Sequence, residues 1–311
     1  MTSPSTKGKV RSFVAGARGM LASDLIPFLK KMGEVETGDL PDFDITDREG
    51  MERLFDKVRP DVVINCAAYT AVDKAETEPD LAYQANARGP ENLARVCAAR
   101  NLPLLHVSTD FVFDGRSTVP YGPDDQACPC SVYGASKAAG EEAVRSLLAA
   151  HIIVRTAWVF SRDGNNFLKT MLRLGNERDS LSIVDDQRGS PTHAADLASG
   201  LHAIAEVIVN NPAFDRWGTY HMTNCGQTTW YRFAEEIFRQ AEPYGQRKPA
   251  LQAISTDQFP TDATRPAYSV LDNSTLSETF KIALPDWRDA VGACLDAIFT
   301  KPVTAQSQGI R

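Results

Sequence analysis

A tyrosine and a lysine four residues apart form the segment with the clearest chemistry, Tyr133-Gly-Ala-Ser-Lys137. At this spacing on a helix, the two side chains project from one face, about 6 Å apart along the axis. A phenol with an ordinary pKa of about 10 is a poor acid–base group at neutral pH, but an adjacent ammonium favours its ionised form. We therefore expect Lys137 to lower the pKa of Tyr133 and to make it an acid–base group.

A hydroxyl and a carboxylate follow the β-rich run at 104–108, in the segment Ser108-Thr109-Asp110. In doubly wound sheets, ligands bind beyond the carboxyl ends of the strands. A Thr109 hydroxyl at that edge can hydrogen-bond the same carbonyl oxygen that Tyr133 protonates. An N-capping turn is the alternative interpretation of this segment. Taken together, the two segments favour a site that binds and protonates a carbonyl group.

A glycine loop, Gly16-Ala-Arg-Gly19-Met-Leu-Ala22, comes directly after a first predicted strand and opens a helix. Gly16 permits a tight turn, Gly19 lets backbone N–H groups approach a pyrophosphate, and Ala22 is small enough for close helix–strand packing. Asp39 ends the second predicted strand, where a carboxylate binds the adenosine ribose of a dinucleotide. The loop therefore predicts a dinucleotide site.

The charges at this end of the site point to different cofactors. Asp39 repels a ribose 2′-phosphate and favours NADH, whereas Arg18 can pair with that phosphate and favours NADPH. The expected cofactor is therefore NADPH or NADH, with both alternatives open.

Short β-rich runs alternate with helical stretches in the first half of the chain. Strands are predicted at 11–15, 35–39, 61–65, 104–108 and 152–156, and helices at 20–31, 46–58, 79–100 and 132–150. A capping-box pattern, Thr46-Asp-Arg-Glu49, marks the start of the second helix. The alternation requires right-handed crossovers and predicts an α/β fold, a Rossmann-like doubly wound parallel sheet.

The alternation loosens after Trp158, where helices are predicted at 166–176, 194–209 and 229–241. We expect residues 10–157 to form an NAD(P)-binding Rossmann domain, completed by segments near 193–225. Residues 158–300 are expected to form mainly a smaller, mixed α/β substrate-binding lobe. The polar ends, 1–9 and 302–311, are expected to be flexible tails.

Composition excludes several classes of protein. A net charge of −7 argues against a nucleic-acid partner held by a general positive field. No run of about 18 apolar residues appears and the N-terminus lacks a signal-peptide core, so we expect a soluble cytoplasmic protein with no membrane partner. The cysteines and histidines lack the spacing of metal ligands, so reduced thiols and no metal are expected.

The motifs resemble those of extended short-chain dehydrogenase/reductases, and more narrowly those of the dTDP-4-dehydrorhamnose reductase family. The resemblance extends from about residue 12 to about residue 288. Besides the glycine loop and the Thr109, Tyr133 and Lys137 set, it rests on the segments 65–76 (NCAAYTAVDKAE), 108–115 (STDFVFDG), 155–160 (RTAWVF), 164–167 (GNNF), 186–192 (DQRGSPT) and 265–266 (RP).

The resemblance implies reduction of the C4 ketone of dTDP-4-dehydro-6-deoxy-L-mannose to dTDP-L-rhamnose in surface-polysaccharide biosynthesis. Tyr133 would be the general acid, Lys137 its activator, and Thr109 the residue that orients the carbonyl. The implied cofactor-binding residues, besides Tyr133 and Lys137, are Gly16, Arg18, Gly19, Met20, Leu21, Asp39, Asp44, Ile45, Ala67, Ala68 and Tyr69. The implied dTDP-sugar-binding residues are Thr109, Asp110, Trp158, Asn166, Phe167 and Arg265.

Some positions depart from the family pattern. Phe111 stands where many members have tyrosine, and Ala195 stands where some have a magnesium-binding glutamate. We therefore assign no metal-binding residues, which puts a metal-bridged dimer in doubt, and expect a monomer or a homodimer. A dehydratase is disfavoured, since it needs a glutamate directly after Asp110. Two alternatives stay open: a reductase of another dTDP-4-keto-6-deoxysugar, and a non-catalytic regulatory subunit like that of methionine adenosyltransferase.

Overall fold

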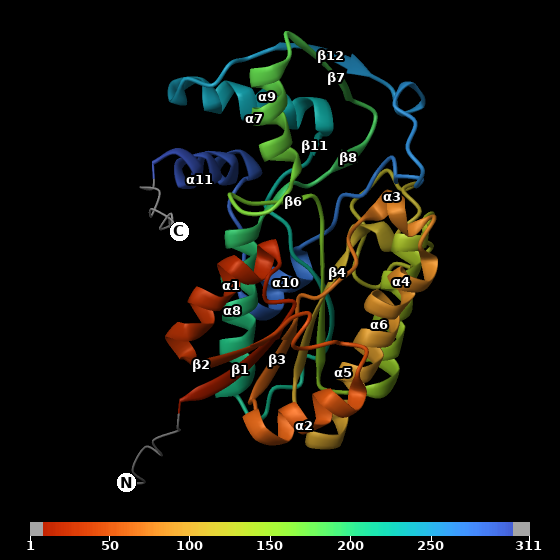
Figure 1. Ribbon diagram of the computed structural model, residues 1–311, viewed down its shortest axis with the longest axis vertical. Helices are drawn as coiled ribbons and strands as arrows, with labels where there is room; N and C mark the ends of the chain where they lie inside the picture. The colour runs from red at the N-terminus through yellow and green to blue at the C-terminus, as the bar shows by residue number, and fades with distance from the viewer. Residues whose placement is uncertain (1–8, 301–311) are drawn as a thin grey trace, which may run out of the picture.

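The computed structural model describes residues 9–300, and apart from Lys9 the predicted tails lie outside them. A parallel sheet flanked by helices forms the lower part of the molecule in Figure 1, and a smaller lobe of helices and short strands lies above it.

The central sheet has six strands, and every neighbouring pair is parallel. Its order is β10-β5-β4-β3-β1-β2, so the chain starts at the strand next to one edge, forms that edge with β2 and then crosses back toward the other edge. The strands are β1 (Val10–Ala15), β2 (Gly33–Gly38), β3 (Val62–Asn65), β4 (Leu104–Thr109), β5 (His151–Thr156) and β10 (Gly218–His221). The predicted doubly wound parallel sheet is confirmed, and the reversal of strand order between β1 and β3 opens a crevice at their carboxyl ends.

Both faces of the sheet are buried, because successive side chains of β1 enter different cores. Val14 packs toward α1 (Met20–Met32) and α8 (Ala194–Asn210). Phe13 and Ala15 pack toward α2 (Arg48–Val58), α5 (Gly89–Arg100) and α6 (Val132–Leu147). These two helix layers lie on opposite sides of the strands in Figure 1. A strand buried on both faces is apolar at consecutive positions, as in the middle of β1.

The second half of the chain returns to the sheet twice. After α8, strand β10 pairs with β5 and becomes an edge of the sheet. Later, α10 (Ser274–Phe280) adds Leu276 and Phe280 to the core that contains Val14. The sheet and its apolar cover therefore draw on residues from both halves of the sequence.

The upper lobe is built around one aromatic-rich core. Helices α7 (Phe167–Glu177), α9 (Trp230–Ala241) and α11 (Trp287–Phe299) meet there, with Phe233, Phe238 and Trp287 almost fully buried. Strands β7 (Ser180–Val184) and β12 (Ala250–Ile254) pair in parallel beside them. Two-residue pairs connect the lobe to the sheet: β6 (Val159–Phe160) with β9 (Thr192–His193), and β8 (Arg188–Gly189) with β11 (Thr228–Thr229).

Two helix predictions need correction. The second helix begins one residue late, because Asp47 rather than Thr46 is its cap and accepts a hydrogen bond from Gly50 N. The predicted helix at 79–100 is three consecutive pieces, α4 (Pro79–Tyr83), a π-helical turn η1 (Gln84–Arg88) and α5. Pro90 has no N–H to bond the carbonyl of Asn86, so the turn widens and Gly89 N bonds Gln84 O instead.

Candidate active site

The start of α6 brings the tyrosine against the end of β4. Ser131 caps the helix by accepting a hydrogen bond from Gly134 N at 3.1 Å. Gly134 permits the close approach, since a Cβ there would lie 2.2 Å from the carbonyl oxygen of Phe111. As a result, Tyr133 lies beside Thr109 and Asp110, as the two sequence segments predict.

Tyr133 is buried, and its ring packs edge-on against Phe111 with centroids 5.5 Å apart. Burial raises the pKa of the Tyr133 hydroxyl to about 12; a hydrogen bond with Thr109 opposes this shift, and the charge of Asp110 adds to it. The expectation that Lys137 lowers this pKa is therefore wrong for this structure. Tyr133 carries its proton at neutral pH, which suits a group that donates one.

Lys137 points to the sheet instead of the phenol. Its ammonium donates a hydrogen bond to the carbonyl oxygen of Val107 at 2.7 Å. Burial lowers the pKa of Lys137 to about 8, while the negative charge of Glu141 opposes the shift. The lysine is thus a charged group at neutral pH that loses its charge in mildly alkaline solution.

Asp110 is almost fully enclosed, with 2% of its surface exposed. Thr109 Oγ1 donates to one carboxylate oxygen at 3.1 Å, and the other oxygen, Oδ2, has no hydrogen-bond partner among the described residues. Burial raises the pKa of Asp110 to about 6, and the nearby Ser269 and Thr109 side chains oppose this shift. A buried carboxyl with a free acceptor beside Tyr133 can bind a substrate hydroxyl.

The glycine loop has the shape that a pyrophosphate needs. Gly16 has a φ of +78°, and a Cβ there would lie 2.5 Å from Ala67 N, so no side chain fits. Gly19 precedes α1 without a side-chain cap, which leaves the first N–H groups of the helix, including those of Met20 and Leu21, available to an anion. The loop therefore fits the dinucleotide that the sequence predicts.

Asp39 lies directly after β2 and holds the glycine loop in place. Its carboxylate accepts hydrogen bonds from Arg18 N at 2.7 Å and Leu40 N at 2.8 Å. The Arg18 residue itself is exposed. Asp44 instead accepts from both the backbone and the hydroxyl of Thr46, forming a turn that places Ile45 against Gly89.

The segment after β3 runs beneath the glycine loop and toward the tyrosine. Asn65 accepts from Ala67 N at 3.0 Å, and Asn86 of the π-helical turn accepts from Tyr69 N at 2.8 Å. Asn86 also donates to Ser136 on α6 at 3.0 Å. The turn that Pro90 widens thus ties the predicted cofactor residues 67–69 to the helix that carries Tyr133.

The upper lobe contains a cavity of about 620 Å³ with Phe167, Gln187, Trp230 and Arg265 in its wall. Trp158 stacks on Trp230 with ring centroids 3.5 Å apart. Its backbone has a φ of +46°, which is unusual for a bulky residue. Such a conformation at the edge of a cavity is typical of a ligand site.

Two of the predicted sugar residues make contacts within the protein. Asn166 caps α7 and donates to Ser161 O at 2.7 Å, so its amide is engaged in the loop before that helix. Arg265 makes a two-pronged ion pair with Asp73, at 3.0 and 2.8 Å. This pair joins the upper lobe to the short helix α3 (Val72–Ala75) of the sheet domain.

The family model described as the RmlD substrate binding domain matches residues 10–299. Two curated relatives, both named dTDP-4-dehydrorhamnose reductase, cover most of both chains. The one from Aggregatibacter actinomycetemcomitans is 42% identical over 285 residues, 90% of this chain and 97% of its own. The one from Sinorhizobium fredii is 40% identical over 281 residues, 90% of this chain and 95% of its own. The chain belongs to the dTDP-4-dehydrorhamnose reductase family.

Solved structures of the family have the same fold. The crystal structure of dTDP-4-dehydrorhamnose reductase from Bacillus anthracis in complex with NADP is 36% identical, with a TM-score of 0.86 over 93% of this chain and 100% of that one. A dTDP-4-dehydrorhamnose reductase from Clostridium acetobutylicum is 40% identical, also with a TM-score of 0.86, over 93% of this chain and 99% of that one. The resemblance read from the motifs is therefore confirmed.

Sequence reasoning missed several residues around this family's site. Trp230, Gln187 and Asp73 are the clearest cases: Trp230 Nε1 donates to Gln187 at 3.2 Å, and Asp73 holds Arg265. Gln187 and Asp73 lie within motifs quoted for the resemblance, which was the signal available. Nothing local to Trp230 indicates that its ring stacks on a tryptophan 72 positions earlier.

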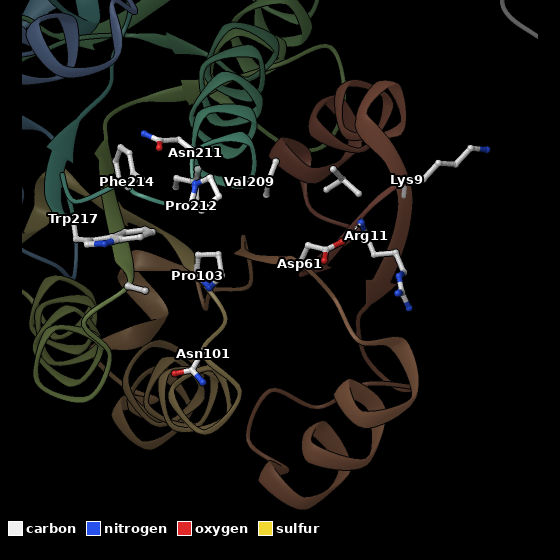
Figure 2. A pocket seen from close by; sticks show the side chains of 13 residues that line it. Lys9, Arg11, Asp61, Asn101, Pro103, Val209, Asn211, Pro212, Phe214 and Trp217 are labelled. Atoms are coloured by element: carbon white, nitrogen blue, oxygen red, sulfur yellow. Dashed lines mark hydrogen bonds between the residues drawn. The ribbon is translucent and has the colours of Figure 1, made fainter. Parts of the chain in front are cut away.

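A second cavity, of about 610 Å³, lies at the opposite end of the sheet. Figure 2 shows Arg11, Asp61, Phe214 and Trp217 around it, at the points where the chain enters the strands. Ligands of doubly wound sheets bind at the carboxyl ends of the strands, so we assign the active site to the other edge.

Within residues 9–300, no group of three or more His, Cys, Asp or Glu side chains is arranged to hold a metal ion. No helix in this range is both long and apolar enough to cross a lipid bilayer.

Proposed function

We propose that this chain reduces the C4 ketone of dTDP-4-dehydro-6-deoxy-L-mannose to dTDP-L-rhamnose with NADPH or NADH. The observation that carries the proposal is the grouping of Tyr133 with Thr109 at the end of β4, with Lys137 one turn further along the same helix and bonded to the same strand. Relatives of 40–42% identity that are named dTDP-4-dehydrorhamnose reductase support the proposal. The crystal structure of a family member with the same fold in complex with NADP supports it as well.

The cofactor residues act mainly through their backbone. Gly16, Gly19, Met20 and Leu21 hold the pyrophosphate at the start of α1, and Asp39 with Arg18 meets the adenosine ribose. Asp44 and Ile45 flank the adenine, and residues 67–69 flank the nicotinamide side. The bound dinucleotide supplies the hydride.

Tyr133 supplies the proton. Since burial keeps its hydroxyl protonated, it is ready to donate to the oxygen on which charge develops as the ketone is reduced. Thr109 hydrogen-bonds that same oxygen and fixes the carbonyl. The Lys137 ammonium, which donates to Val107 O in this structure, would hold the nicotinamide ribose.

The sugar nucleotide lies between the two parts of the chain. Asp110 accepts a hydrogen bond from a sugar hydroxyl through its free oxygen, and Trp158 covers the sugar ring. Phe167 and Arg265 line the nucleotide cavity, while Asn166 keeps the loop before α7 in shape. In this proposal residues 10–157, with the returning segments, bind cofactor, and most of 158–300 binds substrate.

We place the reaction in the cytoplasm, because all six cysteines are free thiols, as in a reducing compartment. The active form is a monomer or a homodimer, since each chain carries a complete residue set.

The test is a coupled assay. Upstream dehydratase and epimerase convert dTDP-glucose to the keto sugar, this protein is added, and NADPH and NADH absorbance is followed with product identification. Cofactor oxidation with dTDP-L-rhamnose as product supports the proposal. Oxidation that yields another sugar would assign a related keto sugar. Cofactor binding without reduction of any keto sugar would contradict catalysis and favour a regulatory subunit.

A further inference from the structure

A buried ion pair lies one helical turn beyond Lys137, and the proposed reaction does not use it. Glu141 on α6 has no exposed surface, and Arg155 on β5 is 2% exposed. Arg155 binds the carboxylate with two hydrogen bonds, Nε to Oε1 at 2.9 Å and Nη2 to Oε2 at 2.7 Å. Two parallel N–H···O bonds fix the carboxylate in position and orientation.

More groups hold this pair from three sides. Arg145 donates to Glu141 Oε2 at 3.1 Å from the next turn of α6. Arg155 also donates to Pro123 O at 3.1 Å and lies 3.4 Å from His221 Nε2 on β10. Burial lowers the pKa of His221 to about 4, so this histidine is neutral. The Glu141 carboxylate is thus held by two guanidinium cations, with a neutral imidazole beside one of them.

A contribution to folding stability does not by itself explain why a buried ion pair is present here. Removing two charges from water costs several kcal/mol per ion, and a well-packed apolar pair of similar size is often as stable. Its location is more informative. Lys137 and Glu141 are four residues apart on one helix face, and their partners are adjacent in the sheet: Val107 precedes Ser108, which pairs with Arg155 across the strands.

We propose that Glu141 is a positioning residue for Lys137: its carboxylate, fixed by Arg155 one helical turn from the lysine, supports the buried ammonium that donates to Val107 O. The inference rests on the function proposed above, because it explains how Lys137 holds its charge in a buried place. Arg155 serves this arrangement by fixing the carboxylate.

The other titratable groups near Lys137 do not supply this charge. Burial raises the pKa of the Cys66 thiol to about 12, and burial places the pKa of His106 well below its ordinary value, so both are neutral at neutral pH. Tyr133 is neutral as well. Among the described residues, Glu141 is therefore the carboxylate whose charge supports the ammonium.

The experiment measures NADPH binding by fluorescence at several pH values between about 6 and 10, without sugar and with the full chain. Wild-type affinity should fall as the pH rises through about 8, as Lys137 loses its charge. Glu141→Gln should move this midpoint down by about one pH unit. Arg155→Met should move it up, because Glu141 then acts on Lys137 with one cation fewer.

Two further variants test whether the charge of Glu141 itself causes the shift of the midpoint. Glu141→Asp retains the charge and should restore part of the midpoint shift. Glu91→Gln removes a glutamate that two arginines also hold, Arg88 and Arg95 on α5, and should leave the midpoint unchanged. If Glu141→Gln does not fold, Arg155→Met still gives a shift of defined direction, an upward one.

An unchanged midpoint in both Glu141→Gln and Arg155→Met, with affinity reduced equally at every pH, would overturn the inference and leave a purely structural pair. A different result would contradict the proposed function while supporting the role of Glu141. In that case the wild type binds NADPH with the expected pH dependence and the variants shift it, yet no keto sugar is reduced in the coupled assay.

Discussion

At the scale of single residues, burial decides the chemistry of this site more than proximity does. Tyr133 and Lys137 lie on one helix face as the spacing requires, but their pKa values are shifted away from the charged forms. The hydroxyl keeps its proton and the ammonium binds a strand carbonyl. Such a site is set to deliver a proton, which is the direction that ketone reduction needs.

Replacing Tyr133 with phenylalanine tests the acid directly. We expect kcat to fall by about 10²- to 10⁴-fold, because a positioned general acid contributes that much, with a smaller change in KM. Tyr121→Phe is a matched control, since it also removes a hydroxyl, bound to Asp114, outside the site. More than about a tenth of wild-type turnover in Tyr133→Phe would contradict the assignment.

Asp110 makes a prediction about stability and pH. Its pKa in the folded chain is about 6, above the ordinary 3.8, so the folded state binds the proton more tightly than the unfolded one. The contribution to stability is full below pH 3.8 and is lost as the pH rises to about 6, in total roughly 3 kcal/mol. Asp110→Asn should flatten this fall in urea-unfolding curves; an unchanged slope would rule out the buried carboxyl as its cause.

At the scale of elements, Asp39 joins the end of β2 to the glycine loop. In the proposed cofactor site the Asp39 carboxylate would repel a 2′-phosphate, so Asp39→Ala should lower the KM for NADPH relative to that for NADH. Some loss with both cofactors is expected too, since Arg18 N loses its acceptor. Steady-state kinetics would give the KM for each cofactor, with Asp42→Ala, at an exposed position, as the control. Unchanged KM values for both would remove Asp39 from the ribose site.

Most strands and helices could be predicted because their signals are local. For the buried run at 62–65 and the glycine loop before α1, the types of a few neighbouring residues are enough to predict the structure. The π-helical turn could not be predicted, since it depends on how Pro90 leaves Asn86 O without an N–H partner inside a longer helical pattern. The downward pKa shift expected for Tyr133 failed because burial is a property of the assembled fold, which helix spacing does not report.

The same limit applies to contacts across the chain. Trp158, in the loop after β5, was expected in the sugar pocket, but its stacking partner Trp230 comes from helix α9, far along the chain. Arg265 was expected at the substrate, and its ion pair with Asp73 joins residues 192 positions apart. Such pairs follow from the packing of the two parts of the molecule, and no periodicity in the sequence encodes them.

At the scale of the whole molecule, the Asp73–Arg265 pair joins the upper lobe to the sheet domain. Both side chains are partly exposed, so the pair contributes little to stability, about 0–1 kcal/mol. Asp73→Asn should leave the melting temperature nearly unchanged and raise the KM for the dTDP-sugar several-fold, since Arg265 loses the partner that fixes it. Asp56→Asn, which breaks a surface pair with Arg100, is the control. An unaltered KM would show that the pair does not order the substrate site.

The return of the chain to the sheet also affects how the protein is made. Val14, Ile64 and Val154 are synthesised early, but Leu276 and Phe280, which share their core, come more than 100 residues after Val154. Until α8 and α10 have emerged, a growing chain on the ribosome therefore covers this apolar sheet face only in part, with α1. Translation that stops after residue 157 would yield a fragment with that face exposed to aggregation, whereas completion of α10 allows the core to close.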